Sequence, residues 1–160
     1  MALEMQVKGL MIDPVSHMPI IVLRDASGES VLPIWVGIFE ANAIAMMLEK
    51  IASPRPMTHD LLRSTIETLR ARVDRVVITD LRENTFFALI HLLRGEERLA
   101  VDARPSDAMA LALRTNAPIF VEDAVLEKSS SGADHESEET ERLRRWLEQV
   151  DPEELGKYEM

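Results

Sequence analysis

The segment Val101-Asp-Ala-Arg-Pro-Ser-Asp-Ala-Met-Ala-Leu-Ala-Leu-Arg114 predicts the end of a strand, a sharp polar corner and then a buried helix. Pro105 suits the first helical position, because the N–H that it lacks would have no helical partner there. Asp107 falls in the first turn, where a carboxylate complements the positive end of the helix dipole. The helix is otherwise rich in Ala, Met and Leu, so it is predicted to lie in the core. The polar corner at its start is therefore the first place to expect a chemical site.

Strands surround this helix in the sequence. Alternating apolar residues and turn signals predict two three-stranded meanders, the first over 5–12, 20–23 and 31–36, the second over 75–81, 85–93 and 99–102. Each meander leads into an Ala/Met-rich helix, over 38–51 and after residue 104 respectively. Grouped strands with few helices indicate an α+β fold, with a mixed sheet packed against helices.

Three further elements follow from local signals. Pro33 removes one backbone donor from the third strand, which predicts that this strand lies at a sheet edge or a bulge. Thr58 is predicted as the N-cap of an amphipathic helix that carries Leu62, Ile66 and Leu69 on one side. A short strand is predicted at 118–121.

Size and composition indicate one soluble domain. The 160 residues are 46% apolar and contain no cysteine, which excludes disulfides, thiolate metal sites and cysteine nucleophiles. The first residues lack the pattern of a signal peptide, and no apolar run is long enough to span a bilayer, so a cytoplasmic protein without membrane contact is expected. Residues 1–127 are predicted as the domain, 128–138 as a flexible polar linker and 139–160 as an acidic helical tail.

The chain is acidic, with a net charge of −10, and half of this excess lies after residue 127. Extensive non-specific coating of nucleic acid needs a basic surface, so that mode of binding is disfavoured. A local cleft with basic groups is still compatible with this composition.

Eight polar residues are candidates for chemistry, because each lies where a strand or loop meets the start of a helix: Glu40, Arg55, His59, Asp60, Asp102, Arg104, Ser106 and Asp107. Their spacing matches no phosphate loop, zinc motif or serine-hydrolase motif. Helix N-termini favour anions such as phosphate, whereas grouped carboxylates favour Mg²⁺ or Mn²⁺. A structural role, as helix-stabilising charges or ordinary ion pairs, is equally compatible with these positions.

Three segments resemble the bifunctional nuclease family: LPIWVGIFEANAIAMMLEK (32–50), SPRPMTHDLL (53–62) and VDARPSDAMALALRTNAPIFV (101–121). The resemblance covers about residues 5–127, and the tail RRWLEQVDPEELGKYE (144–159) is similar to the ending of bacterial members. It implies hydrolysis of phosphodiester bonds in RNA, DNA or both. Some relatives carry a further C-terminal motif like that of excision-repair proteins, which this chain replaces with an acidic tail.

The resemblance places the family's polar motif at the same eight residues, and we assign their roles as a hypothesis. Arg55, Arg104 and Ser106 are expected to bind the substrate phosphate. Glu40, Asp102 and Asp107 are expected to act in catalysis by holding Mg²⁺ or Mn²⁺, which would polarise the phosphate and activate water. His59 or Asp60 is expected to transfer the proton.

The alternative function is a non-enzymatic oligomeric module that binds a small anion or a regulatory partner. The apolar helices and Met-rich strands also predict a surface for self-association. A homo-oligomer is expected, most simply a dimer.

Overall fold

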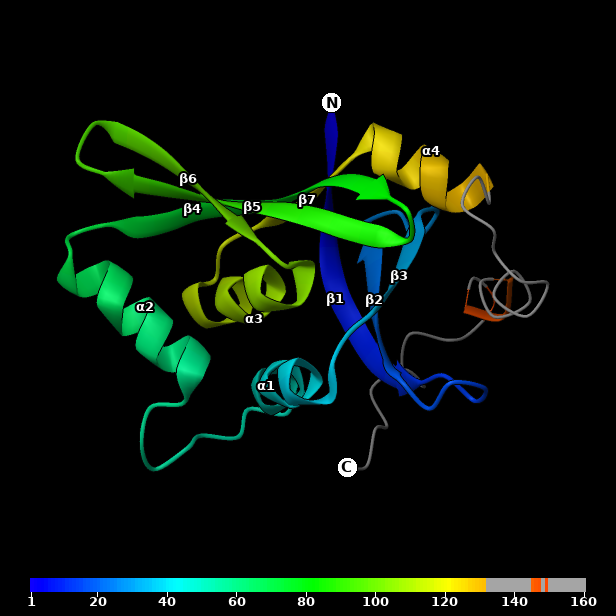
Figure 1. Cartoon of the computed structure of the whole chain (residues 1–160), viewed down its shortest axis with the longest axis horizontal. Helices are drawn as coiled ribbons and strands as arrows, with labels where there is room; N and C mark the ends of the chain where they lie inside the picture. The colour runs from blue at the N-terminus through cyan, green and yellow to red at the C-terminus, as the bar shows by residue number, and fades with distance from the viewer. Residues whose placement is uncertain (132–144, 148, 150–160) are drawn as a thin grey trace.

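The computed structural model describes residues 1–131, 145–147 and 149, and its core is one seven-stranded mixed sheet (Figure 1). The strand order is β3-β2-β1-β7-β4-β5-β6. The strands are β1 (Ala2–Ile12), β2 (Pro19–Asp25), β3 (Val31–Trp35), β4 (Arg72–Arg82), β5 (Thr85–Arg94), β6 (Glu97–Ala103) and β7 (Ile119–Glu122). The helices are α1 (Ile38–Leu48), α2 (Thr58–Thr68), α3 (Pro105–Thr115) and α4 (Asp123–Ser131). The α+β prediction with two three-stranded meanders is confirmed.

The short strand β7 joins the two meanders into one sheet. It pairs antiparallel with β1 on one side and parallel with β4 on the other. All other neighbouring strands are antiparallel, as short hairpin connections require. The strand β3, which contains Pro33, lies at one edge of the sheet, as its missing donor predicts. The strand β6 forms the opposite edge.

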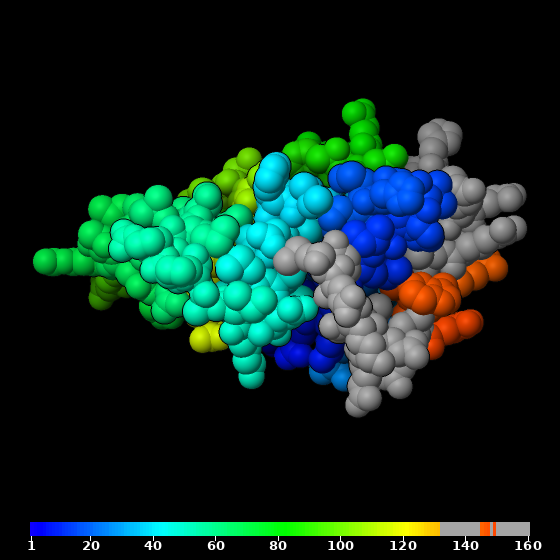
Figure 2. Space-filling model, turned by 90° about the horizontal axis from the view of Figure 1, so that it is seen from below, coloured from blue at the N-terminus to red at the C-terminus, as the bar shows by residue number. Residues whose placement is uncertain are grey.

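The helix α3 occupies the centre of the helical layer. It contacts α1, α2, β4 and β5, and Ala108, Met109, Ala110 and Leu111 are completely buried. Pro105 stands at its first helical position, and Asn116 ends it in the left-handed conformation (φ 54°). The predicted buried helix is therefore confirmed. Figure 2 shows the molecule from the side that α1, α2 and the loop between them cover.

The boundaries of the other helices differ from the sequence prediction. The helix α1 stops at Leu48 rather than residue 51, since Lys50 has a positive φ of 56°. Thr58 is the first residue of α2 rather than its N-cap, and Asp60 instead accepts a hydrogen bond from the Met57 N–H. The helix α4 was not predicted, and it includes Lys128–Ser131, which were assigned to the linker. It packs on β4 and β7, away from the other three helices (Figure 1).

Part of the predicted tail helix is described and contacts the domain. Residues 145–147 and 149 are helical, and Leu147 is completely buried against Ile20 and Val22 of β2. Its carbonyl accepts a hydrogen bond from Arg24 Nη2 at 2.9 Å. The remaining residues of the linker and tail lie outside the described part of the chain. Within that part, no helix has the length and apolar character needed to cross a membrane.

Candidate functional site

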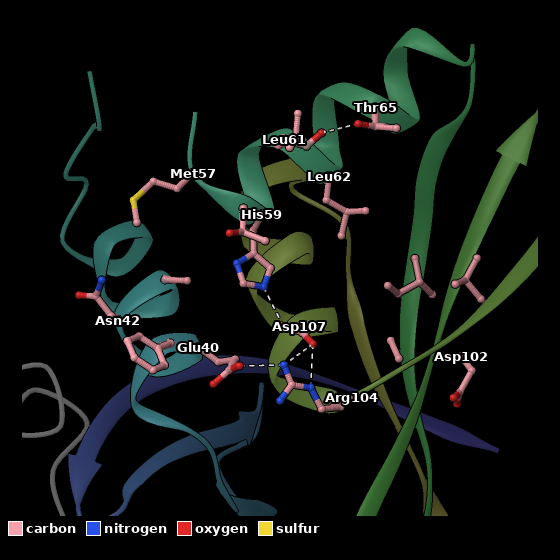
Figure 3. Close-up of a pocket in the computed structure, with 16 residues that line it drawn as sticks. Glu40, Asn42, Met57, His59, Leu61, Leu62, Thr65, Asp102, Arg104 and Asp107 are labelled. Carbon is pink, nitrogen blue, oxygen red and sulfur yellow. Dashed lines mark hydrogen bonds and ion pairs between the residues drawn. The ribbon is translucent and has the colours of Figure 1, made fainter. Parts of the chain in front are cut away.

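A hollow of about 950 Å³ opens on the helical side of the sheet, bounded by α1, α2, the start of α3 and the strands β5 and β6 (Figure 3). Apolar side chains form much of its wall, including Phe39, Met57, Leu61, Leu62 and Val101. Its ionisable side chains are Glu40, His59, Asp102, Arg104 and Asp107. The hollow therefore combines a mostly apolar wall with a few charged groups, as ligand sites commonly do.

Three helix starts bring four of these charged groups together. Glu40 is the third residue of α1, His59 the second of α2 and Asp107 the third of α3. Arg104 precedes α3 with extended backbone (φ −70°, ψ 144°), as the Pro105 that follows it favours. Because α1 and α2 both pack on α3, residues far apart in sequence meet at its N-terminal end.

Arg104 links two carboxylates from different helices. Its Nη2 lies 2.7 Å from Glu40 Oε1, and its Nε and Nη2 lie 2.9 and 2.8 Å from Asp107 Oδ2. The hydrogen bond to Glu40, followed by that to Asp107, raises the pKa of Arg104 above its ordinary value, so the guanidinium stays charged. The Arg104 side chain is nevertheless 65% exposed, against 17% for Glu40. Within the described residues, Nη1 has no hydrogen-bond acceptor and is available to a ligand.

Gly37 makes the position of Glu40 possible. This glycine is the N-cap of α1, and a Cβ placed on it would overlap Glu40 Oε2. The Glu40 carboxylate therefore folds back over the start of its own helix while its other oxygen binds Arg104. Any larger residue at position 37 would displace this carboxylate.

His59 is held by the same carboxylate that Arg104 binds. Its Nε2 lies 2.8 Å from Asp107 Oδ1, and the His59 side chain is only 11% exposed (Figure 3). Asp107 thus uses one oxygen for His59 and the other for Arg104, which fixes both side chains relative to each other. If Asp107 accepts the Nε2 proton, Nδ1 is the basic nitrogen of a neutral His59, the arrangement found in His–carboxylate pairs.

The structure does not bring all eight predicted residues to this point. The Asp102 carboxylate, on β6, is set apart from the other four ionisable groups in Figure 3, although its residue lines the hollow. Asp60 lies beside His59 in sequence, yet its carboxylate binds the Met57 N–H at 3.0 Å and Arg114 Nε at 2.7 Å. These contacts, the Met57 hydrogen bond foremost, lower the pKa of Asp60. Ser106 is buried in the first turn of α3, and Arg55 is exposed in the loop before α2; neither lines the hollow.

Two features of the site were missed in the sequence. One is the apolar wall, which includes Phe39, a residue that is 85% exposed. The available signal was an aromatic residue next to the carboxylate at the start of an apolar helix. The other is Arg114, which is 5% exposed and donates to Asp60, to the Ala43 carbonyl and to the Ala110 carbonyl. It ties α3 to both neighbouring helices behind the hollow.

The three predicted metal ligands do not converge on one point. Arg104 already neutralises Glu40 and Asp107, and Asp102 does not converge with them. In residues 1–131, 145–147 and 149, no group of three His, Cys, Asp or Glu residues is placed to hold a metal ion. The chemistry at this point is therefore derived from Arg104 and His59.

Comparison with known proteins supplies the family. The model of the bifunctional nuclease domain matches residues 21–134, which include every residue that lines the hollow. The chain belongs to the bifunctional nuclease family. The match spans α1 to α4, so the family domain includes the whole helical layer.

Individual relatives agree with this assignment. The chain is 38% identical over 162 residues to an uncharacterized protein of Mycobacterium tuberculosis strain H37Rv, with 95% of this chain and 97% of the relative covered. It is 27% identical over 112 residues to bifunctional nuclease 1 of rice (Oryza sativa subsp. japonica) and to the bifunctional nuclease of Oryza minuta. These matches cover 68% of this chain and 34% of each rice protein.

Proposed function

We propose that this protein hydrolyses phosphodiester bonds of RNA or DNA in the hollow, using Arg104 and His59. The observation that carries the proposal is the continuous chain of contacts from Glu40 through Arg104 and Asp107 to His59, assembled from three helices. Family membership and the two rice nucleases support the reaction class. The charged contacts in the hollow and the family membership together favour a phosphate ligand over other anions.

Arg104 is assigned to the phosphate. Glu40 and Asp107 bind its Nε and Nη2, which fixes the guanidinium before a ligand arrives and leaves Nη1 without an acceptor among the described residues. A fixed cation beside the phosphorus stabilises the charge that develops on the phosphoryl oxygens as water attacks. Glu40 acts through Arg104 as a positioning residue.

His59 is assigned to proton transfer. It accepts a proton from the attacking water while the oxygen of that water bonds to phosphorus, and the P–O bond to the leaving nucleotide breaks. The imidazolium that forms is stabilised by Asp107 at 2.8 Å, and it returns the proton to the leaving oxygen. Asp107 therefore sets the orientation and the charge balance of His59.

A single-stranded substrate fits the wall of the hollow. Phe39 and Met57 are exposed residues of this wall, where an unpaired base can stack, and stacking on an aromatic ring does not require a particular base. A duplex keeps its bases stacked inside, so this surface offers it much less.

The test is cleavage of end-labelled single strands and duplexes of RNA and DNA of one sequence. Arg104→Met and His59→Gln should each reduce the rate about 100-fold or more, since positioned acid–base and electrostatic groups commonly contribute that much. Arg63→Met is the matched control, because Arg63 is an exposed arginine of α2 that pairs with Glu67 and does not line the hollow. Wild-type rates in both site variants would overturn the assignment.

The same assay run with Mg²⁺, with Mn²⁺ and with EDTA addresses the cofactor. A requirement for Mg²⁺ or Mn²⁺ stays a prediction, and full activity in EDTA would contradict it.

The mostly apolar wall beside the oriented Arg104 also fits a second candidate, the binding of a nucleotide or small anion without turnover. That outcome would appear as absent cleavage by the wild type with a rise in Tm on nucleotide addition.

A further inference from the structure

The edge strand β6 is exposed along nearly its whole length. Every residue from Glu97 to Asp102 is exposed, and only Ala103 is partly covered. Leu99 and Val101 are 39% and 46% exposed, unusual for large apolar side chains of a strand. An uncovered edge of this kind offers its backbone to another strand.

The geometry of the β5–β6 turn shows which backbone groups are free. Arg94 pairs with Glu97 across the two residues Gly95 and Glu96, so the residues that flank the turn form a hydrogen-bonded pair. Since such pairs alternate, Glu97, Leu99 and Val101 direct their N–H and C=O groups toward β5. The backbone groups of Arg98, Ala100 and Asp102 consequently point away from the sheet.

We propose that a second copy of this chain pairs with β6 in antiparallel orientation, with Ala100 opposite the Ala100 of the other copy. In this register Arg98 lies opposite Asp102, and Leu99 opposite Val101, in both directions. The outward backbone groups of both strands then match as hydrogen-bonded pairs. Two opposite-charge pairs and two apolar pairs form across one symmetric seam, the self-complementarity that a twofold dimer requires.

Charge selects this register over its neighbours. A shift of two residues in one direction places Glu96 opposite Asp102, and a shift in the other places Arg98 opposite Arg104, so each sets like charges against each other. A shift of one residue puts outward backbone groups against inward ones. Within the described residues, neither Arg98 nor Asp102 forms an ion pair in the single chain. Pairing therefore satisfies both charges, and it gives Asp102 a role that its distance from Arg104 does not provide.

The pairing also changes the hollow. The twofold axis of two antiparallel neighbours runs perpendicular to the sheet, so the helical layers of both copies lie on the same side. Val101 and Ala103 of β6 line the hollow, which places the seam along its wall. The two hollows consequently lie on the same face of the dimer, one on each side of the seam. The pairing itself does not depend on hydrolysis.

The test is the mass of the full chain by light scattering after size exclusion, over about 1 to 100 µM. The wild type should be a dimer. Arg98→Asp and Asp102→Arg should each be monomeric at concentrations where the wild type is dimeric, whereas the double variant carrying both changes should recover the dimer. Arg82→Asp, an exposed arginine at the end of β4, is the control and should leave the mass unchanged. A monomeric wild type, or single variants that remain dimeric, would overturn the proposal.

A cross-link locates the seam independently. The chain has no cysteine, so Ala100→Cys introduces a single thiol on the twofold axis. The Cα separation expected there, about 5.5 Å, is within the range of disulfides. Mild oxidation should give a covalent dimer on a non-reducing gel, and Ser130→Cys on α4 should not. No cross-link at position 100 in a dimeric protein would place the interface elsewhere.

Discussion

The two ends of α3 use the same types of residue for different purposes. At the N-terminal end, Arg104 binds Glu40 and Asp107 with its side chain 65% exposed. At the C-terminal end, Arg114 binds Asp60 and two backbone carbonyls with its side chain 3% exposed. Each arginine joins α3 to α1. The carboxylate partners of Arg104 line the hollow, whereas Asp60, the carboxylate partner of Arg114, does not. The two arginines differ in solvent exposure, and of the two only Arg104 has a guanidinium nitrogen, Nη1, without an acceptor among the described residues.

This difference distinguishes an accessible arginine from a structural one. A buried arginine whose Nε, Nη1 and Nη2 are all bonded holds helices in place, and a ligand cannot reach it. An exposed arginine held on one side by carboxylates is oriented and still accessible. The contacts of Arg114 hold α3 against α1 and α2, and they thereby also position Arg104 at the other end of the same helix.

The largest expected effect is on catalysis. Asp107→Asn should lower the cleavage rate about 100-fold or more, because His59 loses the charge that orients it and stabilises its protonated form. Asp60→Asn, the matched change at the other end, should alter the rate by less than about threefold, since Asp60 does not line the hollow. Rates are measured well below the Tm of both variants. Equal losses in the two would remove the functional distinction between the ends.

The second effect is on the free energy of unfolding, and here the buried end of α3 matters more than the exposed end. Arg114→Met should lower the free energy of unfolding by about 2–4 kcal/mol, because it removes an ion pair with Asp60 and two charge-assisted hydrogen bonds to backbone carbonyls from a side chain that is 3% exposed. Arg104→Met should lower it by less than about 1 kcal/mol, as exposed ion pairs contribute little. Urea unfolding followed by circular dichroism measures both. A greater loss in Arg104→Met would mean that the site itself holds the helices together.

The smallest effect is a dependence on pH. The Met57 hydrogen bond and Arg114 lower the pKa of Asp60 in the folded chain, so its stabilising contribution is present above its unfolded pKa, near the ordinary aspartate value of 3.8. That contribution is lost as the pH falls through the lower folded pKa. The stability gap between wild type and Asp60→Asn should therefore narrow below about pH 4. Urea midpoints at pH 7, 5, 4 and 3 test this, and a gap independent of pH would show that Asp60 acts without its charge.

The sequence predicts the helices and strands better than it predicts which side chains bind one another. Pro105 and the apolar residues after it were sufficient to predict α3, since local geometry and burial both depend on nearby residues. Glu40 was identifiable as a carboxylate in an apolar helix that needs a partner, but that partner, Arg104, is 64 residues away. Arg114 gave no signal, because a basic residue in the last turn of a helix has a common explanation in the dipole.

Other differences have equally local causes. Thr58 is a common N-cap residue, yet the Asp60 carboxylate binds the Met57 N–H and moves the start of α2 by one residue. The helix α4 was hidden by its serines, which are weak helix formers; its stability depends on Val125, buried in the core, and on Lys128 bound to Asp80. Contacts between residues far apart in the sequence determine whether a helix such as α4 forms, and a single sequence does not reveal those contacts.

The position of β7 has a consequence for biosynthesis. Ala2–Met5 of β1 pair with Ile119–Glu122, so β1 leaves the ribosome long before the strand that pairs with its free side. Until then the growing chain holds two unconnected strand groups, each with an unpaired edge. Glu40 and His59 likewise meet Arg104 and Asp107 only after α3 has emerged. A nascent chain therefore cannot possess the complete candidate site until α3 has been translated, and premature termination before residue 119 leaves fragments with unpaired strand edges that are prone to aggregation.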